Sequence, residues 1–372
     1  MARSRQWQAG ERPGKPQKGG KLEKSVAACY IHAMRYIILA GLIVGALLGY
    51  YVLWSHLADQ VATQATAWIE NQRRQGREVE YTGWRLWGFP YRLSLTITNL
   101  NWRDPQSPLA WKLGVEEFTA HLQFWDLHHA IFELPGKQRL GWREGNAEKN
   151  VELTAERFRA SLVLDAANNP LRFAADIAKP AIGGNVLNGW SAEKLLLHAR
   201  RADSQPPSAD LSLQADSITL PANMDGPLGR QMTSLKLIGT LRGNAYGSSP
   251  EAMLASWRDG GGVVDFQTVS LHWGGLMLDG DGTLTLDKQF RPLGALGGQI
   301  RNANAGIDAL AAAGKMKPDE AAAAKAALTL VTKRDAKGEA YLPVPLTAQE
   351  GKLFLGPVPL FSLAPVLTPP TQ

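Results

Sequence analysis

The stretch WRLWGFPYRLSLTITNLNW at residues 84–102 changes character halfway along. Its second half places Leu93, Leu95 and Ile97 at every other position, with polar residues between them. Successive side chains of a β-strand point to opposite faces, so this period of two predicts a strand with one buried face. Gly88 and Pro90, just before it, predict a turn that redirects the chain into the strand.

The same alternation returns many times along the rest of the chain. It is found at 118–124, 158–164, 171–177, 195–197, 211–213, 235–241, 264–266, 276–278, 284–286 and 353–355. One-sided alternation joined by turns such as AANNP and LDGDGTL is typical of antiparallel strands, because parallel strands are buried on both faces. The sequence therefore predicts a mainly β fold (β-rich α+β). It is either a large antiparallel curved sheet or a sandwich, with one or two packed helices at 307–313 and 318–334.

An apolar segment precedes this region. Residues 36–54 read YIILAGLIVGALLGYYVLW, and residues 36–58 contain no Asp, Glu, Lys or Arg. Nineteen residues of helix reach about 28 Å at roughly 1.5 Å per residue, enough to cross a bilayer. Lys and Arg precede the segment, so the positive-inside rule places the N-terminus in the cytoplasm and the bulk of the chain outside. A cleaved signal peptide and a lipidated Cys29 fit less well, because no small-residue cleavage site follows closely and charged residues precede the cysteine.

The expected organisation follows from these segments. It is a basic, disordered cytoplasmic tail at 1–33, a transmembrane helix at 34–58, a stalk helix at 59–80, a β-rich periplasmic domain at 81–363 that divides into two halves near 200–210, and a proline-rich tail at 364–372. Met34 is an alternative start of the chain. The only cysteine, Cys29, lies before the membrane segment, so the exported part cannot form disulfides.

The net charge of +6 belongs entirely to the first 35 residues, which hold eight Lys or Arg and two Asp or Glu. The rest of the chain is neutral and has no general attraction for phosphate backbones, so nucleic-acid binding is not expected. No nucleophile, phosphate-binding or dinucleotide motif is present. The histidines are scattered, and DGDGTLTLD at 279–287 lacks the spacing of a calcium loop. We therefore expect no enzyme activity, no catalytic residues, no metal and no cofactor.

Two surfaces are candidates for binding. The first is the apolar sheet face, with Leu93, Leu95, Ile97, Leu122 and Phe124 as predicted ligand-contacting residues. The second is a membrane-helix interface formed by Gly41, Gly45 and Gly49, whose spacing lets two helices approach closely and predicts a homodimer. Six tryptophans lie between residues 84 and 142. Filling the core of the first sheet is favoured for them over a membrane-facing belt.

Three segments carry a family resemblance: GFPYRLSLTITNLNW, LDGDGTLTLDKQFRPLGALGGQI and VPLTAQEGKLFLGPVPL. They resemble an uncharacterised proteobacterial family of single-span envelope proteins known only as a domain of unknown function, over about residues 34–363. The second segment also resembles the AsmA-like proteins. That resemblance implies an inner-membrane anchor, a β-rich periplasmic part and a link to the homeostasis of outer-envelope lipids, and it defines no functional residues.

The leading hypothesis is a non-enzymatic periplasmic protein, held to the bacterial inner membrane, whose sheet presents an apolar face to lipid or another hydrophobic partner. The alternative is an envelope assembly or scaffold protein that works through protein contacts. Alternation serves a closed sandwich and an open groove equally well, so the sequence leaves both shapes open.

Overall fold

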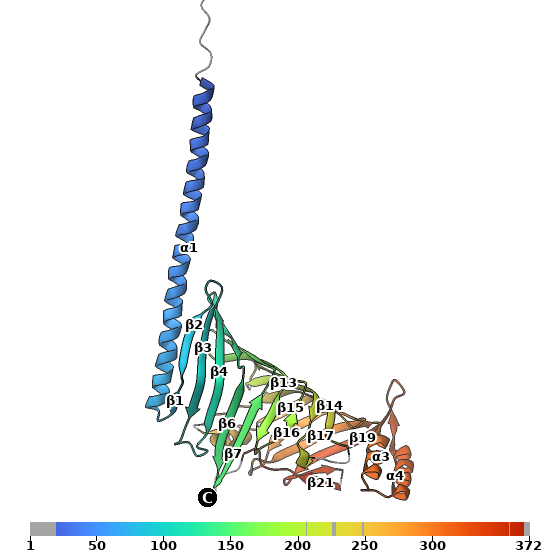
Figure 1. Ribbon diagram of the computed structural model, residues 1–372. Helices are drawn as coiled ribbons and strands as arrows, with labels where there is room; N and C mark the ends of the chain where they lie inside the picture. The colour runs from blue at the N-terminus through green and yellow to red at the C-terminus, as the bar shows by residue number, and fades with distance from the viewer. Residues whose placement is uncertain (1–19, 206, 225–227, 248, 357, 368–372) are drawn as a thin grey trace, which may run out of the picture. The chain divides into compact units, whose positions relative to one another are not determined.

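The computed structural model describes residues 20–205, 207–224, 228–247, 249–356 and 358–367 (Figure 1). The predictions for residues 1–19 and 368–372 lie outside these ranges. The chain forms two compact units, Met1–Val61 and Ala62–Gln372, and helix α1 (Gly20–Arg74) crosses the boundary between them. The apolar part of α1, from Met34 onward, is long and apolar enough to span a membrane. Among the described residues, one helix meets this condition, and it is α1.

Helix α1 differs from the prediction at both ends. It begins at Gly20, so residues 20–33 are helical where a disordered tail was predicted. No Gly or Pro interrupts residues 21–40, which allows the membrane helix to extend backwards. At the other end α1 stops at Arg74, not at residue 80, because Gly76 adopts a left-handed conformation (φ +79°) and the chain turns into a strand at Glu78.

The strands confirm the prediction of a large antiparallel sheet with packed helices. Their bounds are β1 Glu78–Glu80, β2 Gly83–Trp87, β3 Leu93–Arg103, β4 Lys112–Gln123, β5 Asp126–Glu133, β6 Lys137–Glu144, β7 Ala147–Thr154, β8 Arg157–Leu164, β9 Pro170–Ala178, β10 Ala181–Gly184, β11 Trp190–Ser191, β12 Lys194–Ala202, β13 Ser208–Thr219, β14 Gln231–Arg242, β15 Val263–Trp273, β16 Leu276–Leu286, β17 Pro292–Arg301, β18 Lys333–Arg334, β19 Ala340–Gln349, β20 Lys352–Leu355 and β21 Val358–Ser362. All of them connect into one antiparallel sheet. The loop near residues 200–210 does not divide it, since β12 and β13 pair directly from Lys194↔Asp216 to Ala202↔Ser208.

Between β4 and β13 the sheet carries a transverse crease. Short interruptions at 134–136, 155–156, 179–180 and 192–193 separate β5 from β6, β7 from β8, β9 from β10 and β11 from β12. The interruptions lie side by side, because β5, β8, β9 and β12 are neighbours on one side of the crease and β6, β7, β10 and β11 on the other. Four residues along this line are left-handed: Asn99, Gly136, Lys179 and Ser217, with φ of 52°, 79°, 48° and 52°.

The crease resets the alternation of side chains. In β13 the buried apolar residue before it is Ala215 and the one after it is Ile218, so the period of two slips by one residue. In β3 the alternation shifts by one residue in the same way between Ile97 and Trp102, which lie an odd number of positions apart. Both sides nevertheless share one apolar face, since Ala215, Ile218 and Ala192 form a single buried cluster. A left-handed residue in a strand rotates the next side chain and keeps the apolar side continuous.

Three helices accompany the sheet: α2 Pro250–Asp259, α3 Ala303–Ala312 and α4 Pro318–Val331. Helix α3 begins four residues before its predicted start, and α4 ends at Val331 because Lys333 and Arg334 pair with β19 as β18. Helices α3 and α4 pack on each other beside the β19 end of the sheet (Figure 1). Helix α2 was not predicted; its N-cap Ser249 accepts a hydrogen bond from the backbone N–H of Ala252.

Candidate functional site

Strand register aligns two rows of apolar residues and glycines across twelve strands, from β3 to β19. Paired residues of neighbouring strands lie on the same face of a sheet, so each row lies on one face. The first row is Leu93, Leu122, Ala130, Leu162, Phe173, Ala199, Leu211, Gly239, Phe266, Gly282, Leu296 and Leu346. The second is Leu95, Ala120, Phe132, Ala160, Ala175, Leu197, Leu213, Leu237, Val269, Gly280, Gly298 and Val344. We call these two rows the apolar face.

The apolar face is only partly covered. Leu93 and Val344 are buried, as are the small residues Ala160 and Ala175, and Phe173 is 37% exposed. The other leucines and phenylalanines of the two rows are half-buried. In a closed sandwich such side chains would interdigitate with a second sheet and be buried. Among the described residues every strand belongs to the one sheet, so the open alternative of the two predicted shapes is the one observed.

The predicted site residues are only partly brought together. Leu93 is fully buried, and Leu95 and Ile97 line a narrow space against α1 with Ala62 and Ile69. Leu122 is half-buried beside Leu93. Phe124 lies past the end of β4, where its ring meets that of Trp125 edge-on at 4.6 Å. Leu95 and Ile97 therefore pack under the helix, and the open part of the face begins further along the sheet.

Three of the six tryptophans are half-buried and three are exposed. The half-buried Trp102 packs edge-on against Trp68 of α1 at 5.3 Å and against the half-buried Trp111 at 4.9 Å. Trp84, Trp87 and Trp125 are instead 47%, 38% and 61% exposed. The last of the six, Trp142, is half-buried.

Gly41, Gly45 and Gly49 lie in the N-terminal unit, on helix α1. A Cβ atom added to any of them would meet nothing within 4 Å. This surface of the helix is therefore open, and the homodimer remains a prediction.

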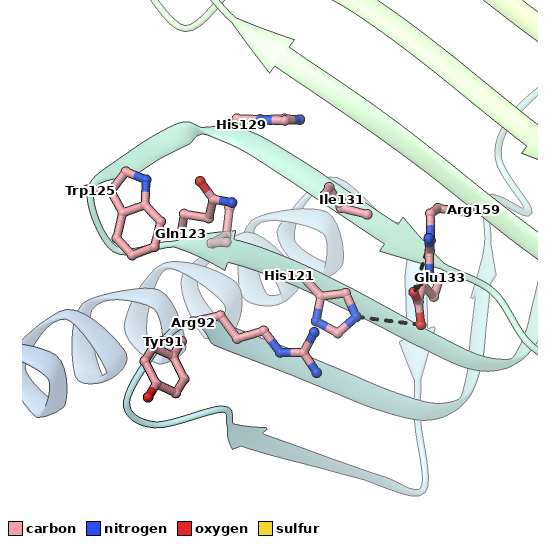
Figure 2. Close-up of a pocket in the computed structure, with 10 residues that line it drawn as sticks. Tyr91, Arg92, His121, Gln123, Trp125, His129, Ile131, Glu133 and Arg159 are labelled. Atoms are coloured by element: carbon pink, nitrogen blue, oxygen red, sulfur yellow. Dashed lines mark hydrogen bonds and ion pairs between the residues drawn. The ribbon is translucent and has the colours of Figure 1, made fainter.

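The opposite, polar face carries a depression of about 380 Å³ at the β3–β4–β5 end (Figure 2). His121 lies at its floor, where Nδ1 is 2.8 Å from the hydroxyl of Ser94 and Nε2 is 3.7 Å from a carboxylate oxygen of Glu133. Burial, with the nearby charge of Arg92, lowers the pKa of His121. The hydrogen bond from Arg159 holds the pKa of Glu133 below its ordinary value.

Serine, histidine and a carboxylate in contact are the components of a hydrolytic triad, but this arrangement does not offer an attacking group. The Ser94 side chain is completely buried, so no substrate can reach its oxygen. Its hydrogen bonds belong to a buried ladder in which Thr96 and Thr119 also pair, at 3.0 Å. The depression is therefore suited to binding a polar group, with arginines and histidines as donors. Sequence reasoning missed it, because its residues are separated in the chain and only the strand register brings them together.

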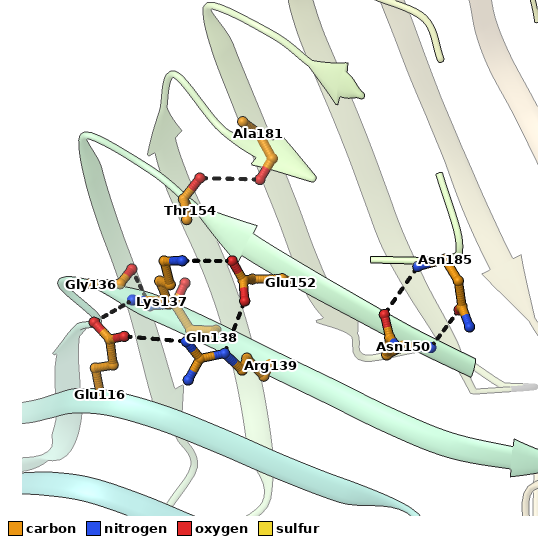
Figure 3. A network of polar contacts seen from close by, with 10 residues as sticks. All are labelled: Glu116, Gly136, Lys137, Gln138, Arg139, Asn150, Glu152, Thr154, Ala181 and Asn185. Atoms are coloured by element: carbon orange, nitrogen blue, oxygen red, sulfur yellow. Dashed lines mark hydrogen bonds and ion pairs between the residues drawn. The ribbon is translucent and has the colours of Figure 1, made fainter. Parts of the chain in front are cut away.

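A second polar network braces the crease (Figure 3). Gln138 donates from Nε2 to the carbonyls of Leu134 and Gly136, both at 3.0 Å, and so ties β6 to the interruption before it. Glu152 accepts from Lys137 and Arg139 at 2.9 Å each. Beside this network lies a depression of about 740 Å³ lined largely by charged and amide side chains. No group of three His, Cys, Asp or Glu side chains in the described part of the chain is arranged to hold a metal ion.

Comparison with known proteins gives one match. No curated protein matches the chain. No solved structure matches it. A bacterial family described as "Uncharacterized protein conserved in bacteria (DUF2125)" matches residues 54–364, which include every strand of the sheet. Because this match covers most of the sequence, the chain belongs to the DUF2125 family.

Proposed function

We propose that this protein is a non-enzymatic, single-pass protein of the bacterial inner membrane, and that the apolar face of its periplasmic sheet binds the acyl chains of lipids. The observation that carries the proposal is the pair of apolar rows that cross twelve strands and in which most of the leucines and phenylalanines stay half-buried. A contiguous apolar surface much larger than a few hundred Å² is rare on a soluble monomer and marks a binding surface. The resemblance to AsmA-like proteins supports the same role in envelope lipid homeostasis.

The proposed topology rests on the apolar helix and its charges. Basic residues precede the span and the neutral remainder of the chain follows it, so the sheet would face the periplasm. No reaction is proposed, because the serine hydrogen-bonded to His121 in the best arranged polar cluster, Ser94, is completely buried.

Photocrosslinking in intact cells tests the ligand. Leu213 and Gln214 are neighbours on β13, and their side chains lie on opposite faces. With benzoylphenylalanine placed at 213 in the full-length protein, irradiation should give lipid adducts detectable by mass spectrometry. The same group at position 214 is the matched control and should give few.

The alternative function predicts a different adduct. If the face works as a scaffold, position 213 should crosslink to a protein of defined size and not to lipid. Equal lipid labelling at 213 and 214, or none at either, would contradict lipid binding by the apolar face.

A further inference from the structure

One end of the sheet carries a cluster of exposed aromatic and apolar side chains. The β2–β3 and β4–β5 turns lie at this end, since Trp87 pairs with Ser94 and Gln123 with Asp126. The exposed fractions of the cluster are Trp87 38%, Phe89 47%, Tyr91 77%, Trp125 61% and Leu127 41%. We call these five residues the aromatic rim. They come from two turns separate in sequence, so one flexible loop does not account for them.

Cationic groups lie directly behind the rim. The guanidinium of Arg92 lies over the ring of Trp87 at 5.0 Å, and that of Arg85 lies at 5.7 Å from the same ring. Tyr91 and Trp125 also line the polar depression that contains Arg92, His121 and Arg159 (Figure 2). Aromatic rings with a polar edge, next to arginine, are the composition that proteins place at the boundary between lipid headgroups and acyl chains.

The helical segment that begins the folded unit runs toward the same end of the sheet. Within the folded unit, Arg73 donates to the carbonyl of Val79, and Trp68 contacts Trp102, both beyond the crease. Ala62 instead lines a narrow space with Trp84 and Leu95, on the rim side of the crease. The helical segment 62–74 thus runs, toward its N-terminus, along the sheet in the direction of the rim. The chain continues from Ala62 into its apolar span.

We propose that the aromatic rim is a membrane-docking surface that inserts into the interface of the bilayer carrying the anchor, with lipid phosphates meeting the arginines behind it. The apolar face begins at the same end, with Leu93 and Leu122. Leu93 itself is buried and the open part of the face begins beyond it, so a rim seated in the bilayer brings the covered start of the apolar face next to the acyl chains. This inference rests on the proposed membrane anchoring but not on lipid occupancy of the apolar face.

Depth measurement with the full-length protein tests the docking. Cys29 is the only cysteine, so Cys29→Ser provides a background for single cysteines at Tyr91→Cys and Trp125→Cys, labelled with a nitrobenzoxadiazole fluorophore. Leu330→Cys is the control, because Leu330 is 88% exposed on α4, far from the rim in sequence. The proteins are reconstituted into vesicles of phosphatidylethanolamine and phosphatidylglycerol that contain lipids with nitroxides near the headgroup.

Labels at 91 and 125 should be quenched by the nitroxide lipids about threefold or more over the label at 330, as expected for a group held at the interface. Adding Arg92→Gln should lower the quenching at 91. Equal quenching at 91 and 330 would overturn the inference, whether both labels are in water or both touch lipid. Photocrosslinking at 213 reports separately on the apolar face, so lipid adducts there without quenching at 91 would refute the docking alone.

Discussion

At the scale of single residues, the buried hydroxyl groups of the opening strand are the most demanding feature of the fold. Ser94 and Thr96 are completely or almost completely buried, and each hydroxyl has a partner on β4. Thr96 also accepts a hydrogen bond from the indole N–H of Trp87 on β2. When a buried polar atom loses its hydrogen-bond partner, the fold loses more stability than the hydrogen bond had contributed. The reason is that the atom gave up its hydrogen bonds to water on folding. These contacts therefore fix the pairing of β3 with β4.

Replacing Ser94 by alanine leaves His121 Nδ1 without its partner in a buried site. We expect Ser94→Ala to lower the free energy of unfolding by about 1–3 kcal/mol. Ser161→Ala is the matched control, since Ser161 bonds the less buried His129 at 3.0 Å, and its loss should be clearly smaller. Urea denaturation of the detergent-solubilised chain measures the free energy of unfolding of both variants. Equal decreases would show that the burial of the Ser94–His121 pair does not determine its contribution to stability.

Asp165 gives a prediction for pH. The hydrogen bond from Arg201, with those from the backbone of Asn169 and Ala167, lowers the pKa of Asp165 to about 2. Since the folded pKa lies below the ordinary value, the carboxylate stabilises the fold above about pH 4 and loses this effect as the pH falls toward 2. The difference in Tm between wild type and Asp165→Asn should therefore be largest near pH 6 and shrink below pH 4. A difference that is constant with pH would contradict it.

At the scale of elements, the strands follow from the sequence and the crease does not. Alternation located β3, β8, β9 and β13 because burial of one face imposes a period of two. The crease interrupts that period through single left-handed residues, and Lys179 or Ser217 in this conformation leaves no pattern in the sequence. The helix ends were missed for the same kind of reason, as with Lys333 and Arg334, which look like a basic last turn but pair with β19.

Asn99 tests the role of the crease. Its φ of 52° suits Asn or Gly and strains a β-branched side chain. We expect Asn99→Val to destabilise the fold by about 1–3 kcal/mol and Asn99→Gly by less than about 1 kcal/mol. Thr98→Val, at the exposed neighbouring position, should change little. Thermal denaturation compares the three, and a tolerated Asn99→Val would show that the crease does not depend on this conformation.

At the scale of the whole sheet, alternation predicted an apolar face but not whether another layer covers it. The same sequence pattern fits both arrangements, and only the half-burial of residues such as Leu213 distinguishes them. The candidate residues chosen from the opening strand illustrate the difficulty. Leu95 and Ile97 lie under α1. They belong to β3, one of the first strands after this helix in the chain, and such strands lie closest to it.

Charge substitution separates the covered part of the face from the open part. Leu93→Asp places a carboxylate in a fully buried site and should unfold the protein, since the cost of several kcal/mol is comparable to the stability of a typical domain. Phe173→Asp, at a 37% exposed position, should cost about 1 kcal/mol while abolishing lipid crosslinking at position 213.

Ala174→Asp, on the polar face of the same strand, is the control for Phe173→Asp and should leave crosslinking intact. Circular dichroism and melting temperature establish folding for each variant. A folded Phe173→Asp variant with undiminished lipid labelling would show that lipid does not lie along these rows.

The length of the two rows has a consequence for stoichiometry. Neighbouring strands are about 4.8 Å apart, so rows that cross twelve strands measure roughly 50 Å, longer than the roughly 30 Å hydrocarbon core of a bilayer. An extended acyl chain spans only about half of that core, so a filled face would hold several chains end to end. Native mass spectra of the loaded protein should therefore show a series of lipid-bound species, in steps of one lipid mass, and not a single one-to-one complex.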